Sequence, residues 1–232
     1  MTDYPLTTWD DNWDLDEWTK VNGLLSSAGL PVSMIFADVE TTGLGESVKK
    51  DHILEVGMAA TDVNGGVIDV WSSFVLGEGW LDAISTMDTV VFKMHVDNSL
   101  LKQYEEAQHG EVFAGYNEAD MRPDMVVDRA WAWLQDLEVE QESQPMCGNN
   151  VPFDRTFIMQ DLPALTDFFH YRNIDVSSTK ELCRRYNPRV YEGKDAMQLG
   201  YDHLPKHRVL YDMAASIREH LFYVDNFLFV EL

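Results

Sequence analysis

The chain of 232 residues is 45% hydrophobic and 12% aromatic, which suffices for the full core of one domain with appendages. Its formal net charge of -23 disfavours passive electrostatic attraction to nucleic acid or anionic membranes. A polyanionic substrate is not excluded, because eight of the 17 basic residues gather near the C-terminus, where they could form a locally positive face: Arg172, Lys180, Arg184, Arg185, Arg189, Lys194, Lys206 and Arg208.

The cysteine content favours a reducing compartment. Cys147 and Cys183 have no Cys-x-x-Cys spacing, and no apolar signal segment begins the chain. No stretch reaches the ~18 apolar residues of a membrane span. We therefore expect a cytoplasmic protein without a membrane partner.

The first thirty residues differ in composition from the rest, because they are rich in acidic residues and tryptophan. The spacing of Trp9, Trp13 and Leu15 is typical of one face of a short helix. We expect residues 1–30 to be an acidic extension docked on a single domain of residues 31–232. The alternative is an arm that binds a partner.

Three strands are predicted at the start of the domain. SMIFAD (33–38), ILEVGMAATD (53–62) and VIDVWSSFVL (67–76) are apolar runs of strand length, and Asn64-Gly65-Gly66 predicts a hairpin between the last two. Successive strands joined in this way predict an antiparallel start to a sheet.

Helices and strands alternate in the remainder of the chain. Periodicity predicts the helices, and short apolar runs predict the strands. In chain order they are helices at 88–107 and 124–137 with a loop at 110–124 between them, a strand at 144–149, a helix near 155–160, a strand at 173–176 and a long helix from about 209 to 225. The fold class is therefore α/β, a mixed sheet with helices packed on its faces.

Two acids stand one residue apart in the first strand, IFADVETTGL. Asp38 and Glu40 project from one face about 6 to 7 Å apart, a separation at which carboxylates can bind divalent cations. Asp136 and Glu138 have the same spacing in a segment that is predicted to be solvated, so spacing alone is weak evidence. The buried strand is the stronger indication, because unpaired buried carboxylates need a cation or hydrogen bonds.

Two later stretches supply further candidate ligands. In CGNNVPFD, Asp154 comes near a helix start, where an acid is also common for capping alone. In HRVLYD, His207 and Asp212 would point about 140° apart on one continuous helix. Both can serve one site only if His207 lies in the loop before the helix, and a single histidine there is usually structural.

Together these stretches resemble the DEDDh family of 3′-to-5′ exonucleases. That family has an Asp-x-Glu on its first strand, an Asp after a middle strand and a His-x-x-x-x-Asp near its end. Within the family the chain is most similar to the oligoribonucleases, in MCGNNVPFDRTF (146–157), FHYRNIDVSSTKEL (169–182) and HRVLYDMAASIREHLFYVDNF (207–227). The resemblance covers residues 33–228, and the residues that match the five motif positions are Asp38, Glu40, Asp154, His207 and Asp212.

The resemblance implies a fold, an activity and a cofactor. The fold would be RNase H-like, and the activity the hydrolysis of short single-stranded RNA, with DNA as an alternative, from the 3′ end to 5′ mononucleotides. Two divalent cations, Mg²⁺ or Mn²⁺, would be held by the four carboxylates, and His207 would be the general base. The active form would be a homodimer.

The resemblance also implies where the substrate binds. A base would rest against Leu44, and the scissile region would lie near His95. Tyr171 and Arg172 would reach across the dimer to a base and the terminal phosphate. Each of these residues also has a plain interpretation, as part of the core or of the ordinary surface.

The phosphate-binding end departs from the family pattern. Ser177 and Ser178 fall where the family has phosphate-binding hydroxyls, but Asn150 stands where it has a serine. Val90 stands where it has a tryptophan that stacks on a terminal base, and an aliphatic side chain loses ~1 to 3 kcal/mol of stacking per base. We therefore expect a weaker restriction to dinucleotides.

Two other functions remain possible on the sequence alone. Residues 1–30 and 110–124 are additions to the family pattern. A DEDDh exonuclease that acts on longer single-stranded DNA or RNA is the closer alternative. A catalytically inert binding module of the same fold is the more distant alternative. Loss of any one of the five motif residues would suffice to inactivate the site, and the chain retains all five.

Overall fold

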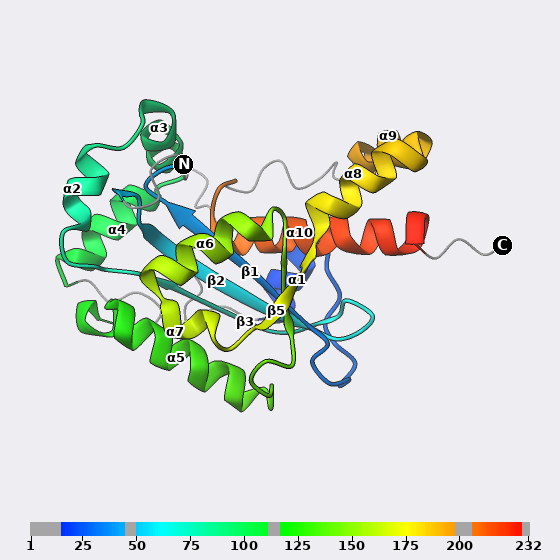
Figure 1. Ribbon diagram of the computed structural model, residues 1–232, viewed down its shortest axis with the longest axis horizontal. Helices are drawn as coiled ribbons and strands as arrows, with labels where there is room; N and C mark the ends of the chain where they lie inside the picture. The colour runs from blue at the N-terminus through cyan, green and yellow to red at the C-terminus, as the bar shows by residue number, and fades with distance from the viewer. Residues whose placement is uncertain (1–14, 45–49, 111–116, 198–205, 229–232) are drawn as a thin grey trace.

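The computed structural model describes residues 15–44, 50–110, 117–197 and 206–228. Its strands are β1 (Met34–Thr41), β2 (Ile53–Thr61), β3 (Val67–Phe74), β4 (Pro145–Gly148) and β5 (His170–Asp175). They form one sheet in the order β3-β2-β1-β4-β5 (Figure 1). The first three strands are antiparallel neighbours, whereas β4 pairs in parallel with both β1 and β5. The predicted mixed sheet with an antiparallel start is confirmed.

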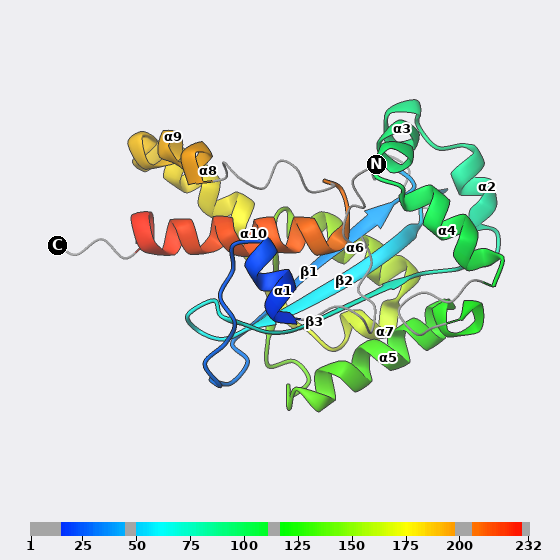
Figure 2. The same cartoon turned by 180° about the vertical axis from the view of Figure 1, so that it is seen from behind.

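Helices cover both faces of the sheet and bury β1 and β2 almost throughout. They are α1 (Leu15–Val21), α5 (Pro123–Asp136), α6 (Val151–Asp161), α7 (Pro163–Thr166), α8 (Val176–Tyr186) and α10 (Val209–Tyr223). Phe36 packs with α1, α8 and α10 on one face, and Ile35 and Ala37 pack with α5, α6 and α7 on the other. Neighbouring strand residues thus serve opposite faces. The helices α1 and α10 lie in front of the sheet in Figure 2, and α6 and α7 lie in front of it in Figure 1.

A helical hairpin lies at the end of the sheet where β1 ends and β2 begins. It follows α2 (Trp80–Ser85) and consists of α3 (Thr89–Asp97) and α4 (Leu100–Gln108), with Tyr104 packed on Phe74. The helical segment predicted at 88–107 is helical, but it is divided into two helices. The chain turns at Asn98 and Ser99, where Ser99 has a φ of 66° and the Asn98 side chain accepts a hydrogen bond from the amide of Leu100.

The segment 110–124, predicted as a loop, connects α4 to α5 and is partly helical where it is described. Residues 117–124 contain a short 3-10 helix, η2 (Glu118–Met121), and the first residues of α5, while residues 111–116 lie outside the described part of the chain. The α5 helix itself agrees with the prediction over 124–137.

Two helices near the C-terminus were not predicted. The carboxylate of Asp175 accepts from the amide of Ser177 and so caps α8 directly after β5, and α9 (Pro188–Met197) follows. Both project beyond one end of the sheet (Figures 1 and 2). Val176 and Cys183 are the buried residues of α8. The predicted final helix is α10, extended by a π-helical turn, η3 (Val224–Leu228).

The described part of the N-terminal extension packs against the domain. Trp18 of α1 is 1% exposed within the core cluster under α10, and Ser26 forms a bridge with Val67 of β3. Residues 1–14, which include Trp9 and Trp13, lie outside the described residues. Among the helices that are described, none has the length and apolar character needed to cross a membrane.

Candidate active site

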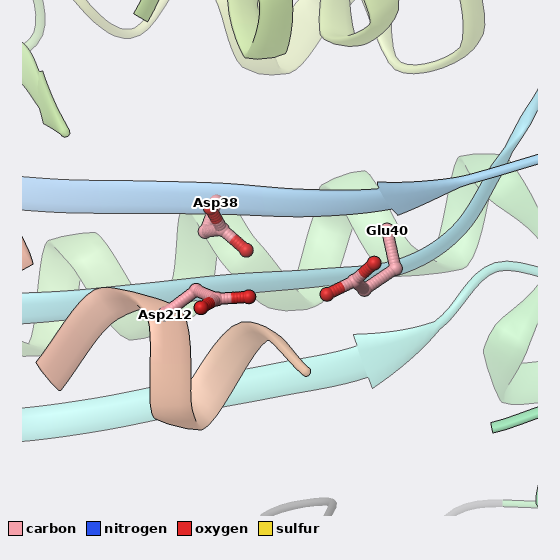
Figure 3. A group of neighbouring side chains, drawn as sticks. All are labelled: Asp38, Glu40 and Asp212. Carbon is pink, nitrogen blue, oxygen red and sulfur yellow. The ribbon is translucent and has the colours of Figure 1, made fainter. Parts of the chain in front are cut away.

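Three carboxylates from two elements converge on one point. Asp38 and Glu40 project from β1, and Asp212 projects from the first turn of α10 (Figure 3). One carboxylate oxygen of each lies within 4.8 Å of the others. The period-two alternation of the strand and the docking of α10 together produce a set of oxygen ligands that suits a hard divalent cation.

A glycine allows α10 to approach the sheet this closely. Gly57 of β2 is the cross-strand partner of Asp38. A Cβ atom added to Gly57 would lie 2.8 Å from side-chain atoms of both Val209 and Met213 on α10, so a larger residue would push the helix away. The close approach brings Asp212 to Asp38.

The fourth predicted ligand, Asp154, reaches the site from a different direction. β4 pairs with β1 only at Ile35 and Phe36, so the neighbouring edge of β1 is left for α6 to contact. There the backbone amide of Val39 donates a hydrogen bond to Oδ1 of Asp154 across 3.1 Å. Asp154 is 4% exposed and close enough to raise the pKa of Asp38, although it is not one of the three residues within 4.8 Å.

The electrostatics of the cluster call for a cation. Burial, together with repulsion from the neighbouring carboxylates, raises the pKa of Asp38 and of Glu40 well above the usual range. The same causes raise the pKa of Asp154 to about 8 and that of Asp212 to about 7. Buried acids that repel one another are stabilised by a bound divalent ion, so the residues present fit the expected metal centre.

His207 lies directly before α10, as the spacing to Asp212 required. It is exposed and has a left-handed φ of 60°, and Arg208 is the N-cap residue of the helix. The Asp212 carboxylate is hydrogen-bonded to the backbone of His207 and of Arg208. Desolvation of the ring by its neighbours and the nearby charge of Lys206 lower the pKa of His207, which favours the neutral imidazole.

A buried ion pair behind the carboxylates was not anticipated. Nε of Arg208 lies 2.8 Å from one carboxylate oxygen of Glu55, and Nη2 lies 2.9 Å from the other. Both side chains are at most 1% exposed, and Glu55 is the cross-strand partner of Glu40. The sequence did offer one sign of this ion pair, because Glu55 is the single charged residue in the apolar strand ILEVGMAAT. Its partner could not be identified, since Arg208 lies 153 positions away.

His95 lies beside the cluster but is fully buried. Its Nε2 donates to the carbonyl of Thr41 across 2.9 Å, and Nδ1 lies 4.0 Å from Oε2 of Glu40. Burial lowers the pKa of His95 to about 4, so the ring is neutral. The His95 side chain has no exposed surface, and its hydrogen bond to Thr41 holds the end of β1 against α3.

The residues predicted to contact bases are exposed. Leu44 is 67% and Tyr171 is 73% exposed, and the Arg172 guanidinium lies 5.3 Å from the centre of the Tyr171 ring. Tyr171 and Arg172 are on β5, at the edge of the sheet. Val90, in the first turn of α3, is 72% exposed.

The predicted phosphate-binding hydroxyls are engaged within the chain. Ser177 donates to Asp175 across 2.8 Å and Ser178 donates to it across 2.7 Å. The amide of Asn150, a residue in the left-handed region, donates to the same carboxylate. Each hydroxyl has one proton, so in this arrangement both serve the cap of α8.

The predicted positive face is partly neutralised. Carboxylates pair with five of its eight basic residues: Lys180 and Lys194 with Glu219, Arg184 and Arg185 with Glu181, and Arg208 with Glu55. The positive charge that this face can offer to a polyanion is therefore smaller than its eight basic residues suggest.

Comparison with known proteins places these features in a family. The profile of the exonuclease family RNase_T matches residues 35–220. The oligoribonuclease of Mycobacterium leprae is 34% identical over 192 residues, which cover 82% of this chain and 79% of that protein. The oligoribonuclease of Mycobacterium avium is 34% identical over 190 residues, with the same coverage.

Solved structures show the same fold at low sequence identity. Exonuclease I from Methylocaldum szegediense matches with a TM-score of 0.55 at 15% identity over 84% of this chain. A zinc-bound complex of Escherichia coli exonuclease I with single-stranded DNA matches with 0.54 at 16% identity over 85%. The chain spans 41% of each of those two proteins. The RNase domain of yeast Pop2 matches with 0.50 at 11% identity, over 90% of this chain and 81% of that one.

Proposed function

Since the chain belongs to the RNase_T exonuclease family, which its oligoribonuclease relatives share, we propose that it is an oligoribonuclease that removes 5′ mononucleotides from the 3′ end of short single-stranded oligonucleotides. The mixed sheet with helices on both faces is the expected RNase H-like fold. The chain is thus a hydrolase of phosphodiester bonds.

The observation that carries the proposal is the convergence of Asp38, Glu40 and Asp212, with Asp154 tied to the same strand. These four residues would hold two divalent cations, Mg²⁺ or Mn²⁺. Bound cations would cancel the carboxylate repulsion and stabilise negative charge on the phosphodiester oxygens. Retention of all four carboxylates in one place disfavours an inert binding module.

His207 is the general base of this proposal. Its neutral imidazole can accept the proton of an attacking water, because its lowered pKa leaves a nitrogen lone pair free near neutral pH. Its position outside the helix, while Asp212 lies inside, lets both residues face one reaction centre.

The exposed residues near the site supply the substrate contacts. Leu44 supports the 3′-terminal base. Tyr171 and Arg172, on the edge strand β5, extend to the base and terminal phosphate bound by a second copy in a homodimer. We place this dimer in the cytoplasm, because the buried thiols of Cys147 and Cys183 are free, as is usual in a reducing compartment.

A second candidate is an exonuclease that acts on longer single strands. The exposed Val90 favours it, because an aliphatic side chain at that point provides no stacking surface to select a terminal base. RNA and DNA are both candidate substrates of that alternative.

End-labelled oligonucleotides test the proposed reaction. Five-nucleotide RNA with a 5′ label, incubated with Mg²⁺ or Mn²⁺, should yield a ladder that shortens one nucleotide at a time, whereas a 3′ label should appear at once as a mononucleotide. EDTA and the Asp212→Ala variant should abolish both patterns. Asp136→Ala, which removes an exposed acid on α5, is the matched control and should retain activity. A ladder that starts from the 5′ end would contradict the proposal.

A further inference from the structure

We propose that Asn98 and Gln103 of the α3–α4 hairpin are positioning residues that hold the backbone on either side of His207. This inference rests on the proposed role of His207 as the general base. A non-glycine residue with a φ of 60° persists only where its surroundings fix it. Two sets of contacts fix the backbone here, one to the carbonyls of Lys206 and His207 and one to the side chain of Arg208.

The first tether is the side chain of Asn98. Its amide nitrogen donates a hydrogen bond to the carbonyl of His207, and it also lies 3.4 Å from the carbonyl of Lys206. Its oxygen accepts from the amide of Leu100 across 3.0 Å. Asn98 is 8% exposed. The buried side-chain amide of Asn98 therefore joins the backbone at the start of α4 to the backbone carbonyl of His207.

The second tether acts through Arg208. Nη1 of Arg208 donates to the side-chain oxygen of Gln103 across 2.9 Å, while the rest of the guanidinium is paired with Glu55 on β2. The guanidinium also lies over the Phe74 ring at 5.9 Å. Arg208 is thus fixed by α4 on one side and by the sheet on the other.

The two tethers leave the His207 side chain exposed while they restrain its main chain. The backbone dihedrals set the direction of the Cα–Cβ bond and limit the rotamers that are allowed, so a fixed carbonyl and a fixed following residue restrict where the imidazole can lie. The same hairpin carries His95, whose Nε2 bonds to the carbonyl of Thr41 next to Glu40. One helical hairpin thereby contacts both the backbone at His207 and the end of the strand that bears two carboxylates.

The Asn98→Asp variant tests the first tether, because it keeps the shape of the side chain and removes the donor. Turnover of a dinucleotide with Mn²⁺ should fall about 10- to 100-fold in kcat, since a misplacement of about 1 Å has that effect, while KM changes less than about threefold. In the metal-free protein, amide hydrogens of residues 208–212 should exchange faster. Gln103→Met, which cannot accept the Arg208 hydrogen bond, should act in the same direction and serves if the first variant fails to fold.

A matched control separates positioning from general stability. Asn226 donates a similar hydrogen bond to the carbonyl of Phe222 across 2.9 Å, near the far end of α10, so Asn226→Asp should leave kcat unchanged. The Asn98→Asp change is then repeated in a His207→Ala background. If Asn98 acts through His207, the second change has no further effect on kcat.

The outcomes are distinct. An unchanged kcat in Asn98→Asp, or the same loss with and without His207, would overturn the inference while leaving the exonuclease proposal intact. A wild-type protein that cleaves no oligonucleotide would overturn the exonuclease proposal and the inference with it.

Discussion

The amide of Val39 donates a hydrogen bond to Asp154 across 3.1 Å, which ties a carboxylate on α6 to the strand residue between Asp38 and Glu40. Two strand acids and one helix acid are thus held by a single peptide segment. Asp212 joins them from the opposite layer, because α10 packs directly over Gly57. The site is therefore built where β1 is contacted from both sides, and its carboxylates stay close despite their repulsion.

Removing one of the carboxylates should have opposite effects on activity and on stability. We expect Asp38→Asn to abolish cleavage and to raise the melting temperature in EDTA at pH 8.5 by about 2 to 8 °C, because an amide keeps the shape of the side chain and cannot carry the buried charge that the carboxyl gains as pH rises. Scanning calorimetry with an oligonucleotide assay measures both. Asp136→Asn is the control, and a lower melting temperature for Asp38→Asn would contradict the electrostatic argument.

The stability of the metal-free protein should fall as pH rises. The pKa of Asp154 is raised from about 3.8 to about 8 and that of Asp212 to about 7. A raised folded-state pKa means that the folded state binds protons more tightly, so its contribution is complete below the unfolded value and is lost as pH rises through the folded one. We therefore expect the melting temperature in EDTA to fall between pH 5 and pH 8.5.

Divalent cations should reverse that loss. Addition of Mg²⁺ or Mn²⁺ at pH 8.5 should restore the melting temperature, because the ions bind the ionised carboxylates of the folded state. The Asp38→Asn and Asp212→Asn variants should respond less. A melting temperature in EDTA that rises with pH would show that other titrating groups outweigh this cluster.

The dependence of activity on pH should report His207. Because its pKa lies below the ordinary value of 6.5, kcat/KM should rise with pH along a limb centred below 6.5. His207→Ala should lose most of the activity together with this limb. Rates measured at constant Mn²⁺ concentration and ionic strength test it, and a limb centred above 7 would remove His207 from the role of base.

The Val90→Trp substitution should sharpen the preference for dinucleotides. Val90 is 72% exposed in the first turn of α3, so an indole can be accommodated there and would add about 1 to 3 kcal/mol of stacking on a terminal base. The KM for a dinucleotide should fall more than that for a 20-mer. Val96→Trp, at an exposed position of the same helix, is the control, and equal changes at both lengths would show that Val90 does not contact the base.

The sequence was sufficient for the parts of the fold whose chemistry is local. The apolar runs of β1, β2 and β3 and the Asn64-Gly65-Gly66 turn predicted the antiparallel strands, and the spacing of His207 and Asp212 correctly placed the histidine outside the helix. The helix break at Ser99 was missed although Asp97, Asn98 and Ser99 are residue types that favour caps and turns. Its cause is a side-chain cap from Asn98.

Contacts between distant segments could not be predicted in the same way. Nothing near Glu55 indicates that its partner is Arg208, and nothing near Asp154 indicates the amide of Val39. The hydrogen bonds of Ser177 and Ser178 to Asp175 were not predicted either, although β5 ends at an acid that caps the next helix. Such pairings depend on which elements the fold brings together, and that information is spread over the whole chain.

The most direct test of the central claim compares turnover of a 5′-labelled RNA dinucleotide with that of a 5′-labelled 20-mer, at equal concentration with Mn²⁺, for the wild-type protein and Asp212→Ala. For a metal-dependent oligoribonuclease we expect the dinucleotide to be consumed faster, release from the 20-mer to be slow, and both to stop in the variant. Equal rates at both lengths would contradict the preference for short substrates, and no cleavage of either RNA would contradict the enzyme itself.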